Sequence, residues 1–233
     1  MIGSFLFNIF YVFWTVFIGI IFLPAVFFPQ HIIILIVGKI WARGLYFFLK
    51  IFCNLKLNLI GKNNIPSSPA IFASKHQSAL ETFMFHLLLN KPVFVLKKEL
   101  LDIPIFGFYL KKMGMIAIDR DGGIRSLKLL LKQVQDKIKE GYSIVIFPEG
   151  TRTIPGKTTE YNPGIVAIYN LKIAPIIPVA LNTGCFWPKK SFLKKPGSFS
   201  IEFLEKMPAE LDKKEFMIRL KDEIELSSNK FLR

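Results

Sequence analysis

Two short segments of the sequence carry side chains suited to proton transfer and to binding an anion. In the first, His76 is followed five residues later by Glu81. A carboxylate at that spacing can accept a hydrogen bond from one imidazole nitrogen, which leaves the other nitrogen free to take a proton from a hydroxyl group. The pair would supply the base and the orienting carboxylate of a catalytic triad. Considered alone, a His and a Glu at this distance are more often an ordinary surface pair.

The second segment reads Phe147-Pro148-Glu149-Gly150-Thr151-Arg152. Arg152 can hold a phosphate through two parallel hydrogen bonds, and Gly150 lets the backbone approach a ligand closely. A turn closed by a surface ion pair is the simpler alternative. The following Gly156-Lys157-Thr158 resembles the end of a nucleotide-binding loop. That motif needs four residues between its glycines, but here there are five, and one is Pro155, which has no N–H for a phosphate.

Both segments follow apolar runs that are typical of β-strands, and helical patterns alternate with these runs along the chain. The predicted strands are Ala70–Ala73, Pro92–Leu96, Met115–Ile118, Tyr142–Phe147, Ala174–Leu181 and Phe199–Phe203. The predicted helices are Ala79–Leu89, Ile105–Met113, Ile124–Glu140, Gly164–Leu171 and a helix from Asp212 onward. Alternating strands and helices predict an α/β fold with a mixed, mainly parallel sheet flanked by helices. Sites in such folds lie where strands pass into helices.

The N-terminal part of the chain has a different composition, because residues 1–38 contain no charged side chain. The apolar run Ile2–Phe28 is long enough to cross a bilayer core of about 30 Å. A cleaved signal peptide would need a basic start and small residues at a cleavage site, and the run has neither. A second helix is predicted over His31–Cys53, and prolines between the two helices would bend the chain. The sequence therefore predicts a two-helix membrane segment that either crosses once or returns as a hairpin.

The charge of the chain indicates an anionic partner. The net charge is +14, and the first acidic residue is Glu81. Lys39, Arg43 and Lys50 fall on one side of the second predicted helix, as on a helix that lies at an anionic membrane surface; a solvated face of a core helix is the alternative. Basic residues that follow the apolar run predict a cytoplasmic location for the rest of the chain. The two cysteines are too few for a disulfide framework or a cysteine-rich zinc site.

Four segments, in this order, resemble the blocks of the 1-acylglycerol-3-phosphate acyltransferase family. The family's His-x4-Asp block matches from His76 onward, with Glu81 in place of the commoner Asp. Its second block matches the run that ends in Arg120, and its third matches every position from Phe147 to Arg152. The fourth, an apolar strand with a proline, matches at Pro178. The resemblance covers about residues 65–185.

This resemblance implies an enzyme that acylates lysophosphatidic acid to phosphatidic acid at a membrane. His76 would deprotonate the free sn-2 hydroxyl, with Glu81 orienting it, and the oxygen would attack an acyl thioester carried by coenzyme A or acyl carrier protein. No metal or further cofactor is implied. The residues expected to hold the glycerol phosphate head are Arg120, Glu149, Gly150, Thr151 and Arg152, with Lys97 and Lys98.

Several alternatives remain open at this stage. The acceptor could be glycerol 3-phosphate or another lysophospholipid, since the four blocks do not separate these substrates. A hydrolase would need a Gly-x-Ser-x-Gly elbow, and the sequence has none. A basic, membrane-tethered lipid-binding protein is the non-enzymatic alternative, while no nucleic-acid motif is visible. We predict two parts, a membrane-embedded helical segment over residues 1–53 and an α/β acyltransferase domain over residues 54–233.

Overall fold

A computed structural model describes residues 1–232 of the chain. Its centre is a seven-stranded sheet in the order β1-β7-β6-β2-β5-β3-β4. Strands β2 to β6 run parallel, β7 runs antiparallel to β6, and β1 pairs parallel with β7. The strands are β1 (Leu55–Ile60), β2 (Ile71–Ser74), β3 (Pro92–Lys97), β4 (Ile116–Ile118), β5 (Ser143–Ile146), β6 (Ile176–Leu181) and β7 (Gly197–Phe203). The predicted mixed, mainly parallel sheet is therefore confirmed.

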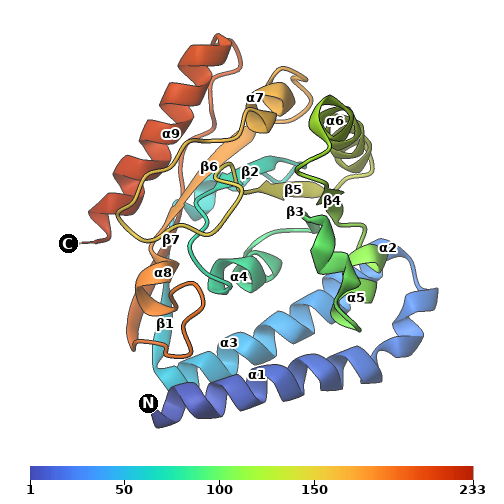
Figure 1. Cartoon of the computed structure of the whole chain (residues 1–233), viewed down its shortest axis with the longest axis vertical. Helices are drawn as coiled ribbons and strands as arrows, with labels where there is room; N and C mark the ends of the chain where they lie inside the picture. Colours follow the sequence, from blue (N-terminus) through green and yellow to red (C-terminus); the bar gives the residue numbers. More distant parts are fainter. Residues whose placement is uncertain (233) are drawn as a thin grey trace.

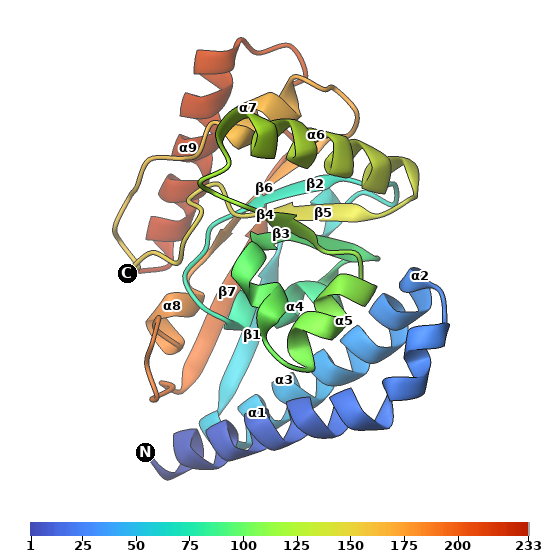
Figure 2. The same cartoon turned by 45° about the vertical axis from the view of Figure 1, so that its right-hand side comes forward.

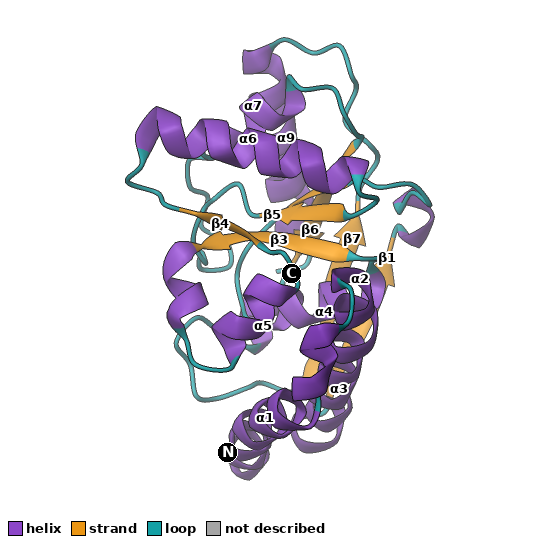
Figure 3. Ribbon diagram, turned by 90° about the vertical axis from the view of Figure 1, so that its right-hand side faces the viewer, coloured by secondary structure: helices purple, strands orange, loops and turns teal. Residues whose placement is uncertain are grey.

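Helices cover both faces of this sheet (Figures 2 and 3). Helices α6, α7 and α9 lie on one face, and α1, α3, α4 and α5 lie on the other. The α-helices are α1 (Ile2–Ile21), α2 (Gln30–Ile32), α3 (Lys39–Cys53), α4 (Leu80–Leu88), α5 (Phe106–Lys112), α6 (Gly123–Lys139), α7 (Gly164–Tyr169), α8 (Thr183–Phe186) and α9 (Lys213–Lys230). Shorter helical turns occupy Leu23–Phe27, Lys62–Asn64 and Lys98–Asp102, and Ile33–Gly38 winds as a π-helix.

The central strands β2, β5 and β6 are buried along their whole length. Ile71 of β2 lies between Ile144 of β5 and Ile176 of β6, and the next residue, Phe72, lies between Val145 and Ile177. Because successive residues point to opposite faces, apolar side chains meet on both faces of the sheet. Strands buried on both faces read as continuous apolar runs, which is why the sequence predicts them well. Strand β1 was not predicted, although its sequence Leu-Lys-Leu-Asn-Leu alternates with the period of two of a half-buried strand.

The two N-terminal helices lie side by side in antiparallel directions (Figure 1). Ile2–Ile21 and Gln30–Cys53 are each long and apolar enough to cross a membrane, by length and composition only. Large apolar side chains of α1 are open to solvent, with Phe5, Ile9 and Phe13 between 55% and 60% exposed. Helix α3 packs against α4, and α1 contacts α5, so both helices of the pair are joined to the sheet domain.

The parallel strands bring four predicted segments to one edge of the sheet. His76 follows β2, Lys97 ends β3, Arg120 follows β4, and Phe147–Arg152 follows β5. Carboxyl ends of parallel strands share an edge, where ligands bind in open α/β sheets. Residues far apart in the sequence therefore meet there.

Candidate active site

His76 lies in the loop between β2 and α4, and its ring is held by the first turn of that helix. The Nδ1 atom lies 2.8 Å from Oε1 of Glu81. Because a carboxylate only accepts hydrogen bonds, the proton of a neutral imidazole belongs on Nδ1. Nε2 is then an acceptor, as a general base requires. The His76 ring also stacks on Phe147, with the ring centroids 3.9 Å apart.

Glu81 is fully buried, and both of its carboxylate oxygens have protein donors. Oε1 also accepts the backbone N–H groups of Gln77 at 2.8 Å and Ser78 at 2.7 Å. Oε2 accepts the hydroxyl of Thr183 at 2.6 Å, from the start of α8. A buried carboxylate is costly unless it is hydrogen-bonded, and here the loop and α8 provide the bonds. The Glu81 side chain is therefore fixed before any ligand binds.

The backbone of His76 is fixed by the loop after β5. Its N–H donates to Oε2 of Glu149 at 2.7 Å, and its carbonyl accepts the N–H of Thr153 at 2.8 Å. Oε1 of Glu149 accepts the hydroxyl of Thr153 at 2.8 Å and lies 2.6 Å from Nζ of Lys75. Burial raises the pKa of Glu149, and the charge of Lys75 opposes that rise. The structure thus places the Glu149 carboxylate among buried protein donors, whereas the sequence grouped it with the phosphate-holding residues.

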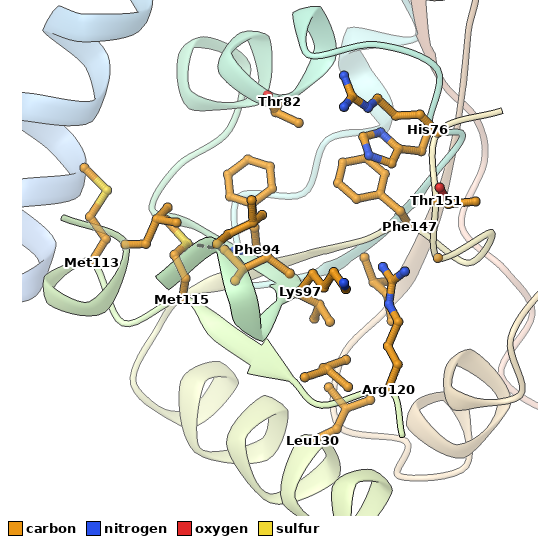
Figure 4. A pocket seen from close by; sticks show the side chains of 18 of the residues that line it. His76, Thr82, Phe94, Lys97, Met113, Met115, Arg120, Leu130, Phe147 and Thr151 are labelled. Carbon is orange, nitrogen blue, oxygen red and sulfur yellow. Dashed lines mark hydrogen bonds between the residues drawn. The ribbon is translucent and has the colours of Figure 1, made fainter. Parts of the chain in front are cut away.

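A cavity of about 860 Å³ opens beside His76 and extends toward the N-terminal helices. Figure 4 shows Lys97, Arg120 and Phe147 on the same side of this cavity as His76, with Met113 and Met115 at the other side. Among the predicted ligand-binding residues, the cavity is lined by Lys97, Arg120, Gly150, Thr151 and Arg152. Five of the seven predicted binding residues therefore share one cavity with His76.

Cationic side chains gather at the His76 end of the cavity. Within residues 1–232, neither Arg120 nor Arg152 forms an ion pair with a carboxylate. Lys97 lies 2.8 Å from the exposed carboxylate of Glu99. Guanidinium groups that no protein carboxylate neutralises are suited to bind a phosphate. Lys98, in contrast, is not among the residues that line the cavity, and its Nζ lies 3.7 Å from a carboxylate oxygen of Asp119.

Gly150 has a backbone conformation that few other residues adopt, with φ of +67°. A Cβ atom at this position would lie 2.6 Å from Nδ2 of Asn162. Asn162 in turn donates from its side chain to the carbonyl of Pro148 at 3.0 Å. The glycine is therefore required both by the turn and by close packing, and it leaves backbone open at the cavity wall.

Lys189 is a cavity-lining cation that the sequence did not reveal. It lies after α8, and its Nζ donates to the hydroxyl of Thr151 and to the carbonyl of Arg152, both at 3.1 Å. The adjacent Pro188-Lys189-Lys190 run was the only signal, and a basic pair in a loop is too common to indicate a site. Lys189 reaches the cavity because the segment that follows α8 returns to the loop after β5.

The opposite end of the cavity is apolar, and the N-terminal helices form part of its wall. Ile18 and Gly19 of α1, Val37 before α3, and Trp41 of α3 line it. Trp41 donates to the Thr15 hydroxyl at 3.0 Å, which ties α3 to α1. The cavity therefore has an apolar end and a cationic end. The His76 ring lies at the cationic end, held by Glu81 and stacked on Phe147.

His86 also lines the cavity, but in different surroundings. It lies on α4 and is almost fully buried, and within the described residues its Nδ1 has no hydrogen-bond partner. Burial, assisted by the charge of Lys39, lowers the pKa of His86 to about 4. This histidine is neutral near pH 7, and among the residues that the structure describes no carboxylate pairs with its ring. Within residues 1–232, no group of His, Cys, Asp and Glu side chains is arranged to hold a metal ion.

Comparisons with known proteins agree with this geometry. The Acyltransferase family model matches residues 56–182. The chain is similar to 1-acyl-sn-glycerol-3-phosphate acyltransferase of Pseudomonas aeruginosa, 36% identical over 170 residues, which cover 73% of this chain and 66% of that protein. It is also similar to a chloroplastic 1-acyl-sn-glycerol-3-phosphate acyltransferase of Arabidopsis thaliana, 31% identical over 158 residues, covering 66% of this chain and 43% of that one. The chain thus spans between 43% and 66% of the length of these two curated relatives.

A solved structure shares the fold over nearly the whole length. The 1-acyl-sn-glycerophosphate acyltransferase of Thermotoga maritima superposes with a TM-score of 0.79, covering 99% of this chain and 95% of that one, at 19% identity. At this identity the likeness concerns the fold alone. The family match spans more than half of the chain and contains His76, Glu81, Arg120 and the Phe147–Arg152 segment. From its sequence match and its site geometry together, this chain belongs to the Acyltransferase family.

Proposed function

We propose that this chain transfers a fatty acyl group from an acyl thioester to the free sn-2 hydroxyl of 1-acylglycerol 3-phosphate, giving phosphatidic acid. One observation carries the proposal: the His76–Glu81 pair adjoins a cavity that is cationic at one end and apolar at the other. A lysophosphatidic acid has the same division, with a phosphate head and an acyl chain. The curated relatives that the chain resembles are named for this activity.

The proposed chemistry starts from a His76 ring that carries its proton on Nδ1, beside Glu81, and leaves Nε2 free to accept one. Nε2 takes the proton of the acceptor hydroxyl while its oxygen attacks the thioester carbonyl. Collapse of the tetrahedral intermediate breaks the carbon–sulfur bond, and the imidazolium returns the proton to the departing sulfur. Glu81 stabilises the imidazolium between these two steps, because its buried carboxylate lies 2.8 Å from Nδ1. The acyl group then resides on oxygen, and no covalent acyl-enzyme forms.

The cationic end of the cavity supports a phosphate-bearing acceptor. Arg120 and Arg152 would bind the phosphate, with Lys97 and Lys189 adding positive charge. Hydrogen bonds to charged groups contribute about 1.5–3 kcal/mol each. A neutral acceptor such as a monoacylglycerol would leave these cations without a partner, so the proposal favours an acceptor with a phosphate monoester.

The N-terminal helices are proposed to associate with a bilayer, which would give the enzyme access to its lipid acceptor. Helix α1 exposes Phe5, Ile9 and Phe13, while α3 buries Ala42, Leu45 and Leu49 in the core of the protein. Because one face of α3 is buried against the protein, the arrangement favours a helix pair that enters the lipid surface and returns. The rest of the chain would then lie on the cytoplasmic side, as the distribution of basic residues predicts.

Vesicle co-sedimentation tests this membrane association. The triple variant Phe5→Ser, Ile9→Ser and Phe13→Ser should lose binding to vesicles of mixed phosphatidylglycerol and phosphatidylethanolamine, because burying each such side chain contributes about 1.5–3 kcal/mol. The variant Ile218→Ser, at a 50% exposed apolar residue on α9 that does not line the cavity, is the control and should bind like the wild type. Equal binding by the triple variant would place the lipid contact elsewhere on the surface.

An acceptor panel tests the activity itself. Purified protein would be supplied with one acyl-CoA and, separately, with lysophosphatidic acid, glycerol 3-phosphate or lysophosphatidylcholine at equal concentrations. We expect the highest kcat/KM with lysophosphatidic acid. A preference for glycerol 3-phosphate or lysophosphatidylcholine would keep the acyl transfer but replace the acceptor. Lipid binding without product from any acceptor, with acyl-CoA and with acyl carrier protein thioesters alike, would overturn the enzymatic proposal in favour of a lipid-binding protein.

A further inference from the structure

A buried cluster of charged side chains lies outside the cavity, at the loop between β2 and α4 that carries His76 (residues 75–79, here named the catalytic loop). Nζ of Lys75 lies 2.6 Å from Oε1 of Glu149 and 2.6 Å from Oε1 of Glu225. Lys75 is 1% exposed and Glu225 is 7% exposed. The Tyr161 hydroxyl donates to Oε1 of Glu225 at 3.1 Å, and burial together with the charge of Glu225 raises the pKa of Tyr161. One ammonium group is therefore shared by two carboxylates that have little access to water.

The cluster is bonded to the backbone of His76. Lys75 directly precedes His76, and Oε2 of Glu149 accepts the His76 N–H at 2.7 Å. Thr153 donates its hydroxyl to Oε1 of Glu149 at 2.8 Å and its backbone N–H to the His76 carbonyl at 2.8 Å. Both backbone polar groups of His76 thus have partners that belong to the cluster or touch it. A change in the position of Glu149 would move the imidazole with its backbone.

Glu225 brings a distant element into this arrangement. It lies on α9, which packs against β6 and is capped by Asp212 at its N-terminus. Within the described residues, Glu225 does not line the cavity. Replacing a buried ion cluster by apolar side chains is often neutral or stabilising, so stability alone is a poor reason to bury these charges. The hydrogen bond from the His76 N–H to Glu149 indicates a different role for the cluster.

We propose that Glu225 of α9 is a positioning residue for His76, acting through Lys75 and Glu149; this inference rests on the proposed acyl transfer. Glu225 holds the Lys75 ammonium at one oxygen of Glu149, which leaves the other oxygen aimed at the His76 N–H. Without Glu225, the partners left to the Lys75 ammonium within residues 1–232 are Glu149 and the carbonyl of Lys157, 3.4 Å away. The ammonium would shift and draw Glu149 away from the His76 N–H. Small displacements of a reacting group lower rates by up to about 10²-fold.

The first experiment separates turnover from binding in Glu225→Gln. We expect kcat per folded enzyme to fall about 10- to 100-fold, because the imidazole is misplaced. Since Glu225 does not line the cavity, KM for lysophosphatidic acid and KM for acyl-CoA should each stay within about twofold of the wild type. Glu225→Asp keeps the charge and should recover part of kcat. Glu223→Gln is the matched control, because Glu223 lies on the same helix in an exposed ion pair with Arg219. It should leave both constants unchanged.

The second experiment tests whether Glu225 acts through Lys75. If it does, Lys75→Met with Glu225→Gln should lower kcat no further than Lys75→Met alone, since interacting residues are non-additive. Multiplied losses in the double variant would overturn the inference, and so would a Glu225→Gln protein with reduced melting temperature but wild-type kcat. Should Glu225→Gln fail to fold, Glu225→Asp and Tyr161→Phe provide the same kcat and KM comparison. Absence of acyl transfer in the wild type would refute the proposed function instead.

Discussion

Two histidines ten positions apart in the sequence, His76 and His86, line the same cavity but differ in the groups that contact their rings. His76 has a buried carboxylate 2.8 Å from Nδ1 and an aromatic ring stacked on its face. His86 has no partner for Nδ1 within the described residues, and burial lowers its pKa to about 4. Of the two, His76 alone has a carboxylate placed to stabilise a positive charge, as its proposed role of general base requires. The comparison therefore assigns the proposed reaction to the His76 end of the cavity.

Removing the His76 imidazole should have the largest effect. A general base contributes about 10²–10⁴-fold to rate, so His76→Ala should lower kcat toward the upper part of that range while the protein remains folded. His86→Phe keeps a planar ring in the apolar surroundings and should lower kcat by less than about tenfold, as a near volume-conserving change. The measurement is kcat per folded enzyme with lysophosphatidic acid and acyl-CoA. Equal losses in the two variants would erase the distinction between the two ends.

Glu81→Gln should have the second-largest effect, a loss of about 10³-fold in kcat. An amide neither stabilises the imidazolium nor enforces the Nδ1–H tautomer of His76. The four donors on the Glu81 oxygens are positioned for a side chain of this length. Glu81→Asp would retract the carboxylate by one methylene, so we expect an intermediate rate despite the family's commoner Asp. A wild-type rate in Glu81→Gln would remove Glu81 from the mechanism.

His86 should make the protein less stable in acid. Its pKa is about 4 in the folded protein and about 6.5 when unfolded, so the unfolded chain takes up the proton first as pH falls. The stability contributed by neutral His86 is complete above pH 6.5 and is lost between pH 6.5 and pH 4, by about 3 kcal/mol. Denaturation of wild type and His86→Phe across this range measures it. His31→Gln, at an exposed residue, is the control; equal slopes in wild type and His86→Phe would contradict the assignment.

Arg152 should show the smallest of these effects, and one confined to the acceptor. Loss of a charge-assisted hydrogen bond costs about 1.5–3 kcal/mol, or about a 10- to 100-fold change. Arg152→Ala should raise KM for lysophosphatidic acid by this factor, and Arg152→Lys by less, with KM for acyl-CoA nearly constant. Arg120→Ala should behave likewise if both groups face one phosphate. A defect in the donor KM alone would move Arg152 to the thioester side of the site.

Features that depend on residues close together in the sequence could be predicted best. The apolar runs predicted six of the strands, and the five-residue spacing of His76 and Glu81 predicted their contact. The segments after β2, β4 and β5 could be expected to meet because parallel strands end at a common edge. The period-two alternation of β1 is visible in its sequence although the strand was not predicted, whereas the four-residue helix α8 is too short to show a periodic pattern.

Contacts between distant segments could not be read from the sequence. The bond from Thr183 to Glu81 and the pairing of Lys75 with Glu225 depend on how β6, α8 and α9 return to the catalytic loop. The predicted division between residues 53 and 54 separates the N-terminal helices from the α/β part. In the structure, however, Ile18 and Trp41 of these helices line the cavity. Deleting residues 1–53 would therefore open the cavity as well as remove the apolar helices, which makes point substitutions the better test of lipid binding.

The most direct test of direct transfer to the acceptor, with His76 as base, follows thiol release from acyl-CoA by purified full-length protein. Without acceptor, the account predicts no release of coenzyme A. On addition of lysophosphatidic acid, release should begin and should equal the phosphatidic acid formed, mole for mole. One thiol released per enzyme before the acceptor is added would indicate a covalent acyl-enzyme, and continuous release without acceptor would indicate a hydrolase. Either result would contradict the mechanism proposed for His76.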